Sequence, residues 1–294
     1  MNKVGFIGVG IMGKSMVRNL MKAGFELHIY ARTKSKVEDV IGEGAQFHES
    51  IKDCVQDCDA VITIVVFPQD VEEVYFDQGN ILDSVKKGAY LIDMTTTSPQ
   101  IAEKIYEEGT KRGFHVMDAP VTGGDTGAKA GTLSILVGGE KEDYEACMPL
   151  FEAMGTNINY QGKAGCGQHC KLANQIMIAG TLSGVCEALT YAKEQGLDPE
   201  VFMKSVATGA AGSKQLDTFG PKILKDDYAP GFFMKHFIKD MKLALIEANR
   251  KGLSLDVLSM VLANYEELEQ EGYGDLGTQA LMKFYDEEHR NTEE

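Results

Sequence analysis

The most constraining feature of this sequence is an alternation, in its first half, between short apolar runs and longer stretches with helical periodicity. The runs are continuously apolar, which is typical of strands that are covered on both faces. Strands separated by helices pair in parallel order. The runs are VGFIG (4–8), LHIY (27–30), AVITIVV (60–66), AYLIDM (89–94) and FHVMDA (114–119). They predict an α/β fold built on a doubly wound parallel sheet.

The pattern changes in the low 160s. Two more β-rich runs, 132–139 and 157–162, flank a helical segment at 142–154 and complete the sheet. Beyond them the chain shows only helical segments, of which the first, 167–195, is unusually long. We therefore predict a sheet domain over 1–163 and an all-helical domain over 164–294, joined by that long helix. The later helices are expected at 199–207, 214–224, 234–249, 256–269 and 276–288.

Composition and charge narrow the class of protein. The chain has 29 basic and 44 acidic side chains and a formal net charge of −15, which opposes binding to nucleic acid or to anionic membranes. Its longest apolar run, 60–67, is far shorter than the ~20 residues that span a bilayer. The six cysteines lack the spacing of a metal site, and no secretory signal precedes the first strand. We expect reduced thiols, no bound metal and a cytoplasmic location.

Three glycines directly after the first predicted strand indicate a nucleotide site. Gly8, Gly10 and Gly13 have the G-x-G-x-x-G spacing, between a strand and a helix. In such a motif the first glycine permits a tight turn, the second lets a pyrophosphate approach the backbone, and the third lets helix and strand pack closely. The phosphates then lie at the helix N-terminus. The context makes the sheet domain Rossmann-like and predicts a bound dinucleotide.

The residues after the second predicted strand indicate which dinucleotide binds. An NAD site usually carries an acid here that bonds the ribose 2′-hydroxyl, and residues 31–36 contain none. Arg32 suits a 2′-phosphate because its planar fork can bind the phosphate bidentately, and Lys36 adds positive charge. NADP is therefore predicted in preference to NAD, with a solvated basic loop as the alternative.

A second candidate site lies at the start of the long predicted helix, in GQHCKLANQ (167–175). Lys171, Asn174 and Gln175 are spaced i, i+3 and i+4, so they share one helix face. An ammonium group beside two amides could bind the substrate of a carbonyl reduction, then stabilise and protonate its oxygen. Burial can lower the pKa of a lysine toward working pH. The residues alone leave a simple salt bridge between domains equally open.

Five segments, taken together and in order, resemble the β-hydroxyacid dehydrogenase family. They are FIGVGIMGKSMVRNLMKAG, IDMTTTSP, DAPVTGGDTGAKAGTLSILVGG, GQHCKLANQ and FIKDMKLAL, and the similarity covers essentially the whole chain. The resemblance implies an NADP-dependent oxidoreductase that reduces a small semialdehyde or 2-oxo acid to a hydroxy acid, or runs the reverse reaction. It makes Lys171 the proton donor and Asn174 its amide partner. It also implies a small carboxylate-bearing substrate and a homodimer or homotetramer.

The resemblance assigns further positions. The cofactor contacts that it implies are Ile11 and Met12 over the pyrophosphate, Arg32 and Thr33 at the ribose phosphate, Phe67 and Pro68 at the adenine-side ribose, Thr96 beside the nicotinamide, and Lys239 from the helical domain. The family's substrate-carboxylate loop falls on 118–124, where Thr122 replaces the usual serine and the amides of Gly123 and Gly124 would bind the carboxylate. Ala31 departs from the N-R-T pattern of NADPH-using members.

Two other functions stay open. Imine reductases share this architecture but typically carry aspartate or tyrosine at the position of Lys171, so the lysine disfavours them. A catalytically silent nucleotide-binding or interaction protein would be expected to have lost that lysine.

Overall fold

The computed structural model describes residues 1–285, which divide into two compact units, Met1–Lys171 and the part from Leu172 onward. The sequence pattern predicted a division at 163/164. The observed division lies inside the long helix α10 (Cys166–Glu194), because the first turn of this helix is hydrogen-bonded to the sheet unit. The last predicted helix, 276–288, is a 3-10 helix over Thr278–Tyr285, and its final residues lie outside the described part of the chain.

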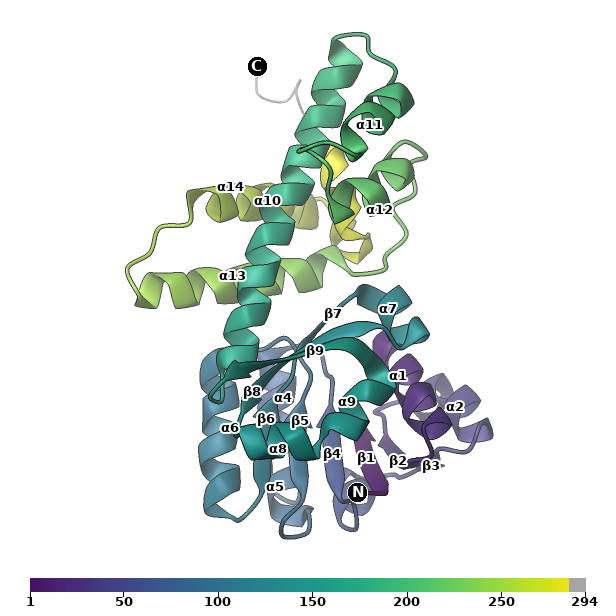
Figure 1. The fold of residues 1–294 in the computed structure, drawn as a ribbon, viewed down its shortest axis with the longest axis vertical. Helices are drawn as coiled ribbons and strands as arrows, with labels where there is room; N and C mark the ends of the chain where they lie inside the picture. Colours follow the sequence, from purple (N-terminus) through teal and green to yellow (C-terminus); the bar gives the residue numbers. More distant parts are fainter. Residues whose placement is uncertain (286–294) are drawn as a thin grey trace. The chain divides into compact units, whose positions relative to one another are not determined.

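The sheet unit contains one nine-stranded sheet in the order β3-β2-β1-β4-β5-β6-β8-β7, with β9 paired to β8 (Figure 1). The strands are β1 (Lys3–Ile7), β2 (Glu26–Tyr30), β3 (Gln46–Phe47), β4 (Ala60–Thr63), β5 (Tyr90–Asp93), β6 (His115–Asp118), β7 (Val121–Thr122), β8 (Leu133–Gly139) and β9 (Gly155–Gly162). Strands β1 to β6 are parallel, and β8 is antiparallel to both β6 and β7. The predicted α/β fold is confirmed. Strands β3 and β7 escaped prediction because two residues carry no periodic signal.

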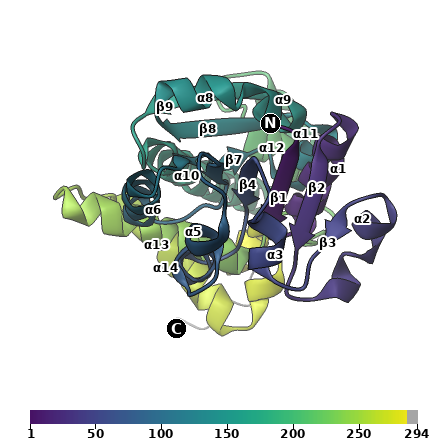
Figure 2. The same cartoon turned by 90° about the horizontal axis from the view of Figure 1, so that it is seen from below.

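Helices cover both faces of this sheet, as Figure 2 shows. The helices of the sheet unit are α1 (Ile11–Lys22), η1 (Lys34–Lys36), α2 (Glu38–Gly42), α3 (Ile51–Val55), α4 (Pro68–Phe76), α5 (Ile81–Ser84), α6 (Pro99–Lys111), α7 (Gly124–Ala130), α8 (Lys141–Ala146) and α9 (Met148–Met154). Neighbouring strand residues enter opposite cores: Phe6 packs with α1 and α9, and Ile7 packs with α3 to α6. Two-sided burial is the physical reason for the unbroken apolar runs.

The helical unit continues from α10 through α11 (Pro199–Ala207), α12 (Lys214–Ile223), α13 (Met234–Arg250), α14 (Asp256–Gln270), η2 (Tyr273–Asp275) and η3 (Thr278–Tyr285). Asp198 caps α11 by accepting bonds from the Glu200 and Val201 amides, directly before the proline at its first turn. The core of the unit contains Phe237 and Tyr265, whose rings meet edge to face with centroids 5.5 Å apart.

By length and composition alone, α10 is the one described helix that could cross a membrane. Buried core helices of soluble proteins pass the same test. Here the buried residues Leu172, Ala179, Leu182, Cys186 and Leu189 belong to the core of the helical unit. We therefore interpret α10 as a core helix. The sequence pattern did not predict this candidate span because polar residues interrupt every long apolar run in the segment.

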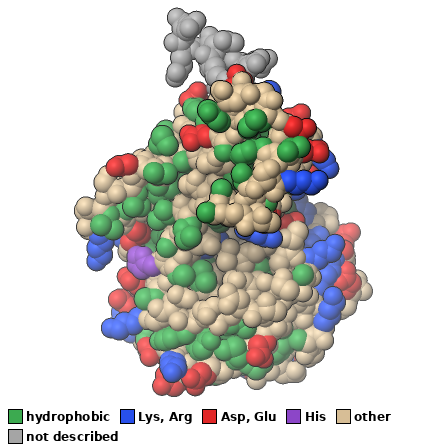
Figure 3. Space-filling view, turned by 45° about the horizontal axis from the view of Figure 1, so that its top comes forward, with side chains coloured by type: hydrophobic (Ala, Val, Ile, Leu, Met, Phe, Trp, Pro, Cys, Tyr) green, Lys and Arg blue, Asp and Glu red, His purple; other side chains and the backbone are tan. Residues whose placement is uncertain are grey.

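Basic and acidic side chains are interspersed over the face drawn in Figure 3. Across the described residues, many charged side chains form ion pairs: Arg18, for example, donates to both Asp39 and Glu43 at 2.7 Å. Such exposed pairs each stabilise a fold only slightly.

Candidate active site

The loop after β1 is shaped by its glycines. Gly8 has a φ of +97°, and a Cβ at this position would lie 2.1 Å from the carbonyl oxygen of Ile64. A Cβ at Gly13 would lie 2.2 Å from the carbonyl oxygen of Gly8, so the third glycine lets α1 press against the loop. A Cβ at Gly10 would meet no atom within 4 Å. Gly8 and Gly13 are therefore needed for close packing of the backbone, whereas the space next to Gly10 is open.

The start of α1 fits the phosphates of a dinucleotide. Gly10 is the N-cap and has no side chain to cap the helix, and the first turn contains no acidic residue. The backbone N–H groups of Ile11, Met12 and Gly13 belong to the first turn, where a helix provides no partners of its own. The positive end of the helix dipole adds to their attraction for an anion.

The switch point of the doubly wound sheet lies beside this loop. The strand order reverses between β1 and β4, and ligands of such sheets bind outside the carboxyl ends at this switch point. Three large apolar side chains follow these two strands and are exposed, Ile11 at 58%, Val66 at 39% and Phe67 at 41%. Pro68 then begins α4. Exposed apolar side chains next to a phosphate site suit a nucleotide's flat rings.

Arg32 follows β2, but two acids from another element hold its side chain. Its Nη2 donates to Oδ1 of Asp70 at 2.7 Å and to Oε2 of Glu73 at 2.9 Å, both on α4. These contacts, led by the hydrogen bond to Asp70, raise the pKa of Arg32. Residues 31–36 contain no acidic residue, but folding brings two acidic residues of α4 into contact with Arg32. Thr33 and Lys36 are exposed next to Arg32.

Gln168, in the first turn of α10, connects that helix to the sheet. Its side chain is fully buried; Nε2 donates to the Thr95 carbonyl at 2.7 Å, and Oε1 accepts from the Thr97 amide at 3.0 Å. The side-chain amide of Gln168 is thus bonded to the backbone of the two residues on either side of Thr96. Lys171 lies one helical turn further along the same face of α10 and is 8% exposed.

A second set of hydrogen bonds, to the carboxyl group of Asp118 at the end of β6, also anchors the start of α10. The backbone N–H groups of Gly165 and Gln168 each donate to Asp118 at 2.8 Å. Burial raises the pKa of Asp118, although these two bonds oppose the rise. Lys171 therefore follows a helix start that is anchored on two strand ends.

Another buried carboxyl group lies at the end of β5. Oδ1 of Asp93 accepts from Thr63 Oγ1 at 2.8 Å and from the Thr95 amide at 3.1 Å, and Thr63 also contacts the Tyr75 hydroxyl at 3.1 Å. Oδ2 of Asp93 has no hydrogen-bond partner among the described residues. Burial, as the largest cause, raises the pKa of Asp93 to about 6. One carboxyl oxygen of Asp93 is therefore hydrogen-bonded and the other is not.

The predicted carboxylate loop, 118–124, runs from the end of β6 through β7 to the first residue of α7. Thr122 pairs with Ser134 across the antiparallel β7·β8 ladder. Gly123 and Gly124 follow it; both are exposed, with φ values of +131° and +65°. A turn of this kind presents consecutive backbone N–H groups, which suits a carboxylate.

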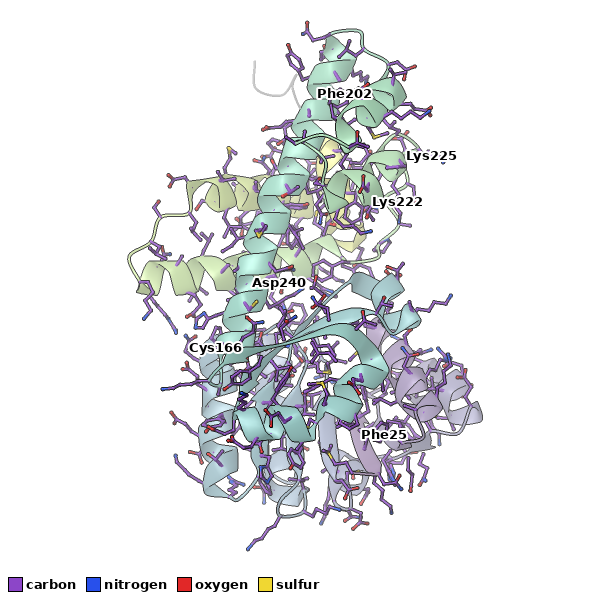
Figure 4. All side chains as sticks on the ribbon, in the orientation of Figure 1. Phe25, Cys166, Phe202, Lys222, Lys225 and Asp240 are labelled. Atoms are coloured by element: carbon purple, nitrogen blue, oxygen red, sulfur yellow. The ribbon has the colours of Figure 1, made fainter. Side chains whose placement is uncertain are left out.

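The remaining predicted residues belong to the helical unit. Asn174 Nδ2 donates to Gln175 Oε1 at 2.8 Å, and Gln175 Nε2 donates to Asp240 Oδ2 at 2.7 Å. Asp240, labelled on α13 in Figure 4, also forms an ion pair with Lys239 at 3.0 Å. Gln175 is 2% exposed and both ends of its amide bind protein groups, so it holds Asn174 in place. The predicted contact of Gln175 with a substrate stays a prediction.

The structure thus places the predicted site residues in two groups. The sheet unit contains the glycine loop, Arg32, Thr96, the carboxylate loop and Lys171. The helical unit contains Asn174, Gln175 and Lys239. Among the described residues, no cluster of three or more His, Cys, Asp or Glu side chains could hold a metal ion.

Sequence reasoning missed four residues that shape these sites: Gln168, Asp93, Asp70 and Glu73. Gln168 offered one signal, its position three residues before Lys171 on the same helix face. The two acids of α4 offered none, because they are some forty residues from Arg32 in the sequence.

The fold and the glycine loop define a protein with a Rossmann-like, dinucleotide-binding domain, and comparisons with known proteins name its family. Residues 3–162 match the family described as the NAD-binding domain of 6-phosphogluconate dehydrogenase. Residues 165–285 match the family described as "NAD-binding of NADP-dependent 3-hydroxyisobutyrate dehydrogenase".

Curated relatives are similar over most of the chain. The chain is 49% identical to an uncharacterized oxidoreductase of Bacillus subtilis, over 96% of this chain and 98% of the relative. It is 44% identical to a probable mitochondrial 3-hydroxyisobutyrate dehydrogenase-like protein of Arabidopsis thaliana, over 95% and 84% respectively. Among solved structures, the 3-hydroxyisobutyrate dehydrogenase of Mycobacterium tuberculosis with L-serine matches with a TM-score of 0.88, at 26% identity over 96% and 98%. The chain belongs to the β-hydroxyacid dehydrogenase family.

Proposed function

We propose that this chain is an NADP-preferring reductase of a small semialdehyde or 2-oxo acid, forming a hydroxy acid, or the enzyme of the reverse reaction. Membership of an NAD(P)-dependent dehydrogenase family supports the reaction class. The observation that carries the proposal is the Gln168 bridge. It joins the first turn of α10, and with it Lys171, to the backbone on either side of Thr96.

The cofactor would be held by the chain's own groups at the switch point. In the proposal, the N–H groups of Ile11, Met12 and Gly13 bind the pyrophosphate, and Phe67 and Pro68 contact the adenine-side ribose. Arg32, Thr33 and Lys36 bind the 2′-phosphate, while Thr96 and Lys239 lie nearer the nicotinamide. When bound, the nicotinamide supplies or takes up a hydride.

The chain itself would position the substrate and move one proton. Thr122, Gly123 and Gly124 bind the substrate carboxylate through a hydroxyl and backbone N–H groups. Lys171 Nζ holds the proton that passes to the carbonyl oxygen in reduction, and it takes the proton back in oxidation. Asn174, oriented by Gln175, offers an amide to the same oxygen. Two-ended binding of a small molecule supplies the orientation that such a reaction needs.

The relatives support the substrate class. The Mycobacterium tuberculosis structure contains L-serine, a small molecule with a carboxylate and a β-hydroxyl group. We propose a substrate of the same size for this chain.

The proposal includes a cytoplasmic homodimer or homotetramer. All six cysteines are free, which supports a reducing compartment. The helical unit exposes large apolar side chains on α10 and α14, among them Met177 at 73%, Val257 at 59% and Met260 at 52%. Such side chains support burial against another copy of the chain. Sedimentation of the purified protein tests the oligomeric state.

Turnover and binding, measured on the same variants, test the proposed reaction. Wild type is assayed for oxidation of NADPH and NADH with glyoxylate, succinic semialdehyde, tartronate semialdehyde and methylmalonate semialdehyde. Lys171→Ala should bind NADPH like wild type and lose turnover by at least ~100-fold, the usual scale of a proton donor. Lys193→Ala, at the exposed far end of the same helix, is the matched control and should keep both properties.

Three results would contradict the proposal. Near wild-type turnover by Lys171→Ala would exclude the proton-donor role. Binding of NADPH without turnover of any aldehyde, by a folded wild type, would favour the silent nucleotide-binding protein. Turnover of cyclic imines in place of aldehydes would favour an imine reductase.

A further inference from the structure

We infer that Glu73, acting with Asp70, weakens this chain's preference for NADP over NAD by holding the guanidinium group of Arg32. The inference rests on the proposed function, since it concerns the nucleotide that binds beside Arg32. It makes two acids of α4 determinants of cofactor specificity, although neither lies in the segment after β2 that normally sets it.

The geometry gives the two acids different roles. Asp70 is built into the start of α4: its Oδ2 accepts from the Phe67 amide at 2.9 Å, while its Oδ1 accepts from Arg32 at 2.7 Å. The side chain of Asp70 is only 17% exposed. Glu73, one turn further, contacts Arg32 at 2.9 Å from a side chain that is 49% exposed. Glu73 is therefore the partner of Arg32 that can be changed without disturbing the helix start.

The charges at this place oppose a phosphate. One guanidinium and two carboxylates sum to a net charge of −1, counted from Arg32, Asp70 and Glu73 alone. The 2′-phosphate of NADP carries further negative charge and must compete with both carboxylates for the same guanidinium. NAD has a 2′-hydroxyl group at this position, and a nearby carboxylate is the group with which NAD sites bond it.

The ion pairs are exposed enough to exchange. The Arg32 side chain is 62% exposed, so water and salt screen its pairs and each is worth little. Arg32 can exchange its ion pair with Glu73 for one with a phosphate at a small cost in free energy. In Glu73→Gln this ion pair is absent, and the cost disappears. The arrangement predicts a chain that accepts both cofactors, with Glu73 limiting its preference for NADPH.

Dissociation constants for NADPH and NADH, measured by nicotinamide fluorescence at low salt, test this inference without relying on turnover. Glu73→Gln should tighten NADPH roughly fivefold, the scale of one exposed ion pair, and leave NADH within about twofold. Glu72→Gln is the matched control, because it removes the same charge from the same helix. Glu72 pairs with Lys104 at 3.0 Å instead. This control should shift both constants by less than about twofold.

A double-mutant cycle with Arg32→Ala separates the inference from the function on which it rests. Arg32→Ala should weaken NADPH far more than NADH, and Glu73→Gln should give no further gain in that background. If Arg32→Ala weakens NADPH far more than NADH, but Glu73→Gln changes the two dissociation constants no more than Glu72→Gln does, the inference fails and the proposed NADP site stands. If Arg32→Ala weakens both cofactors equally, the NADP assignment fails, and the inference with it. An equal gain from Glu73→Gln with and without Arg32 would mean general electrostatics, and would also overturn the inference.

Discussion

Replacing the buried acid at the end of β5 by its amide should stabilise the protein at neutral pH. Asp93 is 2% exposed, and its Oδ2 has no hydrogen-bond partner among residues 1–285. Asparagine has nearly the same shape and can still accept the bonds from Thr63 and the Thr95 amide. Asp93→Asn removes the cost of ionising a carboxyl group in this environment.

The magnitude follows from the pKa of Asp93, which burial raises from an ordinary value of 3.8 to about 6 in the folded chain. Because the folded state binds the proton more tightly, the protonated acid favours folding below pH 4. That contribution is lost as the pH rises through 6. A difference of about two pKa units corresponds to about 3 kcal/mol. Because the unfolded carboxyl group is already partly ionised at pH 4, the free energy of unfolding of Asp93→Asn, relative to wild type, should rise by about 2 kcal/mol between pH 4 and pH 7.

Urea unfolding of both proteins at half-unit steps from pH 4 to pH 8 measures this difference. Asp57→Asn, at an exposed position, is the control for the loss of one negative charge. A difference between Asp93→Asn and wild type that stays constant over this pH range would refute the reasoning. It would mean that Asp93 is not ionised at a cost in the folded protein.

Two further substitutions test the geometry of the site. Gln168→Leu keeps the size of the side chain but removes its bonds to the Thr95 carbonyl and the Thr97 amide. We expect urea unfolding to show a loss of about 2 kcal/mol, and assays to show a fall in kcat with an unchanged dissociation constant for NADPH. An unchanged kcat would mean that the bridge serves stability alone. Gly13→Ala places a Cβ 2.2 Å from the Gly8 carbonyl oxygen, so α1 must shift. Binding of NADPH and NADH, measured by fluorescence, should weaken together, and unaltered binding of both would contradict the role given to this close approach.

Much of the sheet unit could be predicted from the sequence because local rules and global fold agree there. The apolar runs predicted strands covered on both faces, and the two cores on either side of the sheet confirm this through Phe6 and Ile7. The glycine spacing predicted a turn whose conformation Gly8 adopts, with its φ of +97°. These features need only neighbours in the sequence.

One error was local: the single helix predicted at 142–154 is two, α8 and α9, with Pro149 in the first turn of the second. Other features could not be predicted because they join residues that are distant in the sequence. The side chain of Gln175 donates to Asp240, sixty-five residues later. No local pattern contains these pairings.

By itself, the sequence determined the order of strands and helices, the dinucleotide loop and the helix face that carries Lys171. These depend on periodicity and on backbone conformation, which are set within one or two turns of chain. Only the tertiary structure decided the surroundings of the charged groups. It placed Asp70 and Glu73 against Arg32, left Asp93 half-satisfied, and tied α10 to the sheet through Gln168. The physical reason is that charge and hydrogen bonding act through space, and the distances over which they act exist only after the chain has folded.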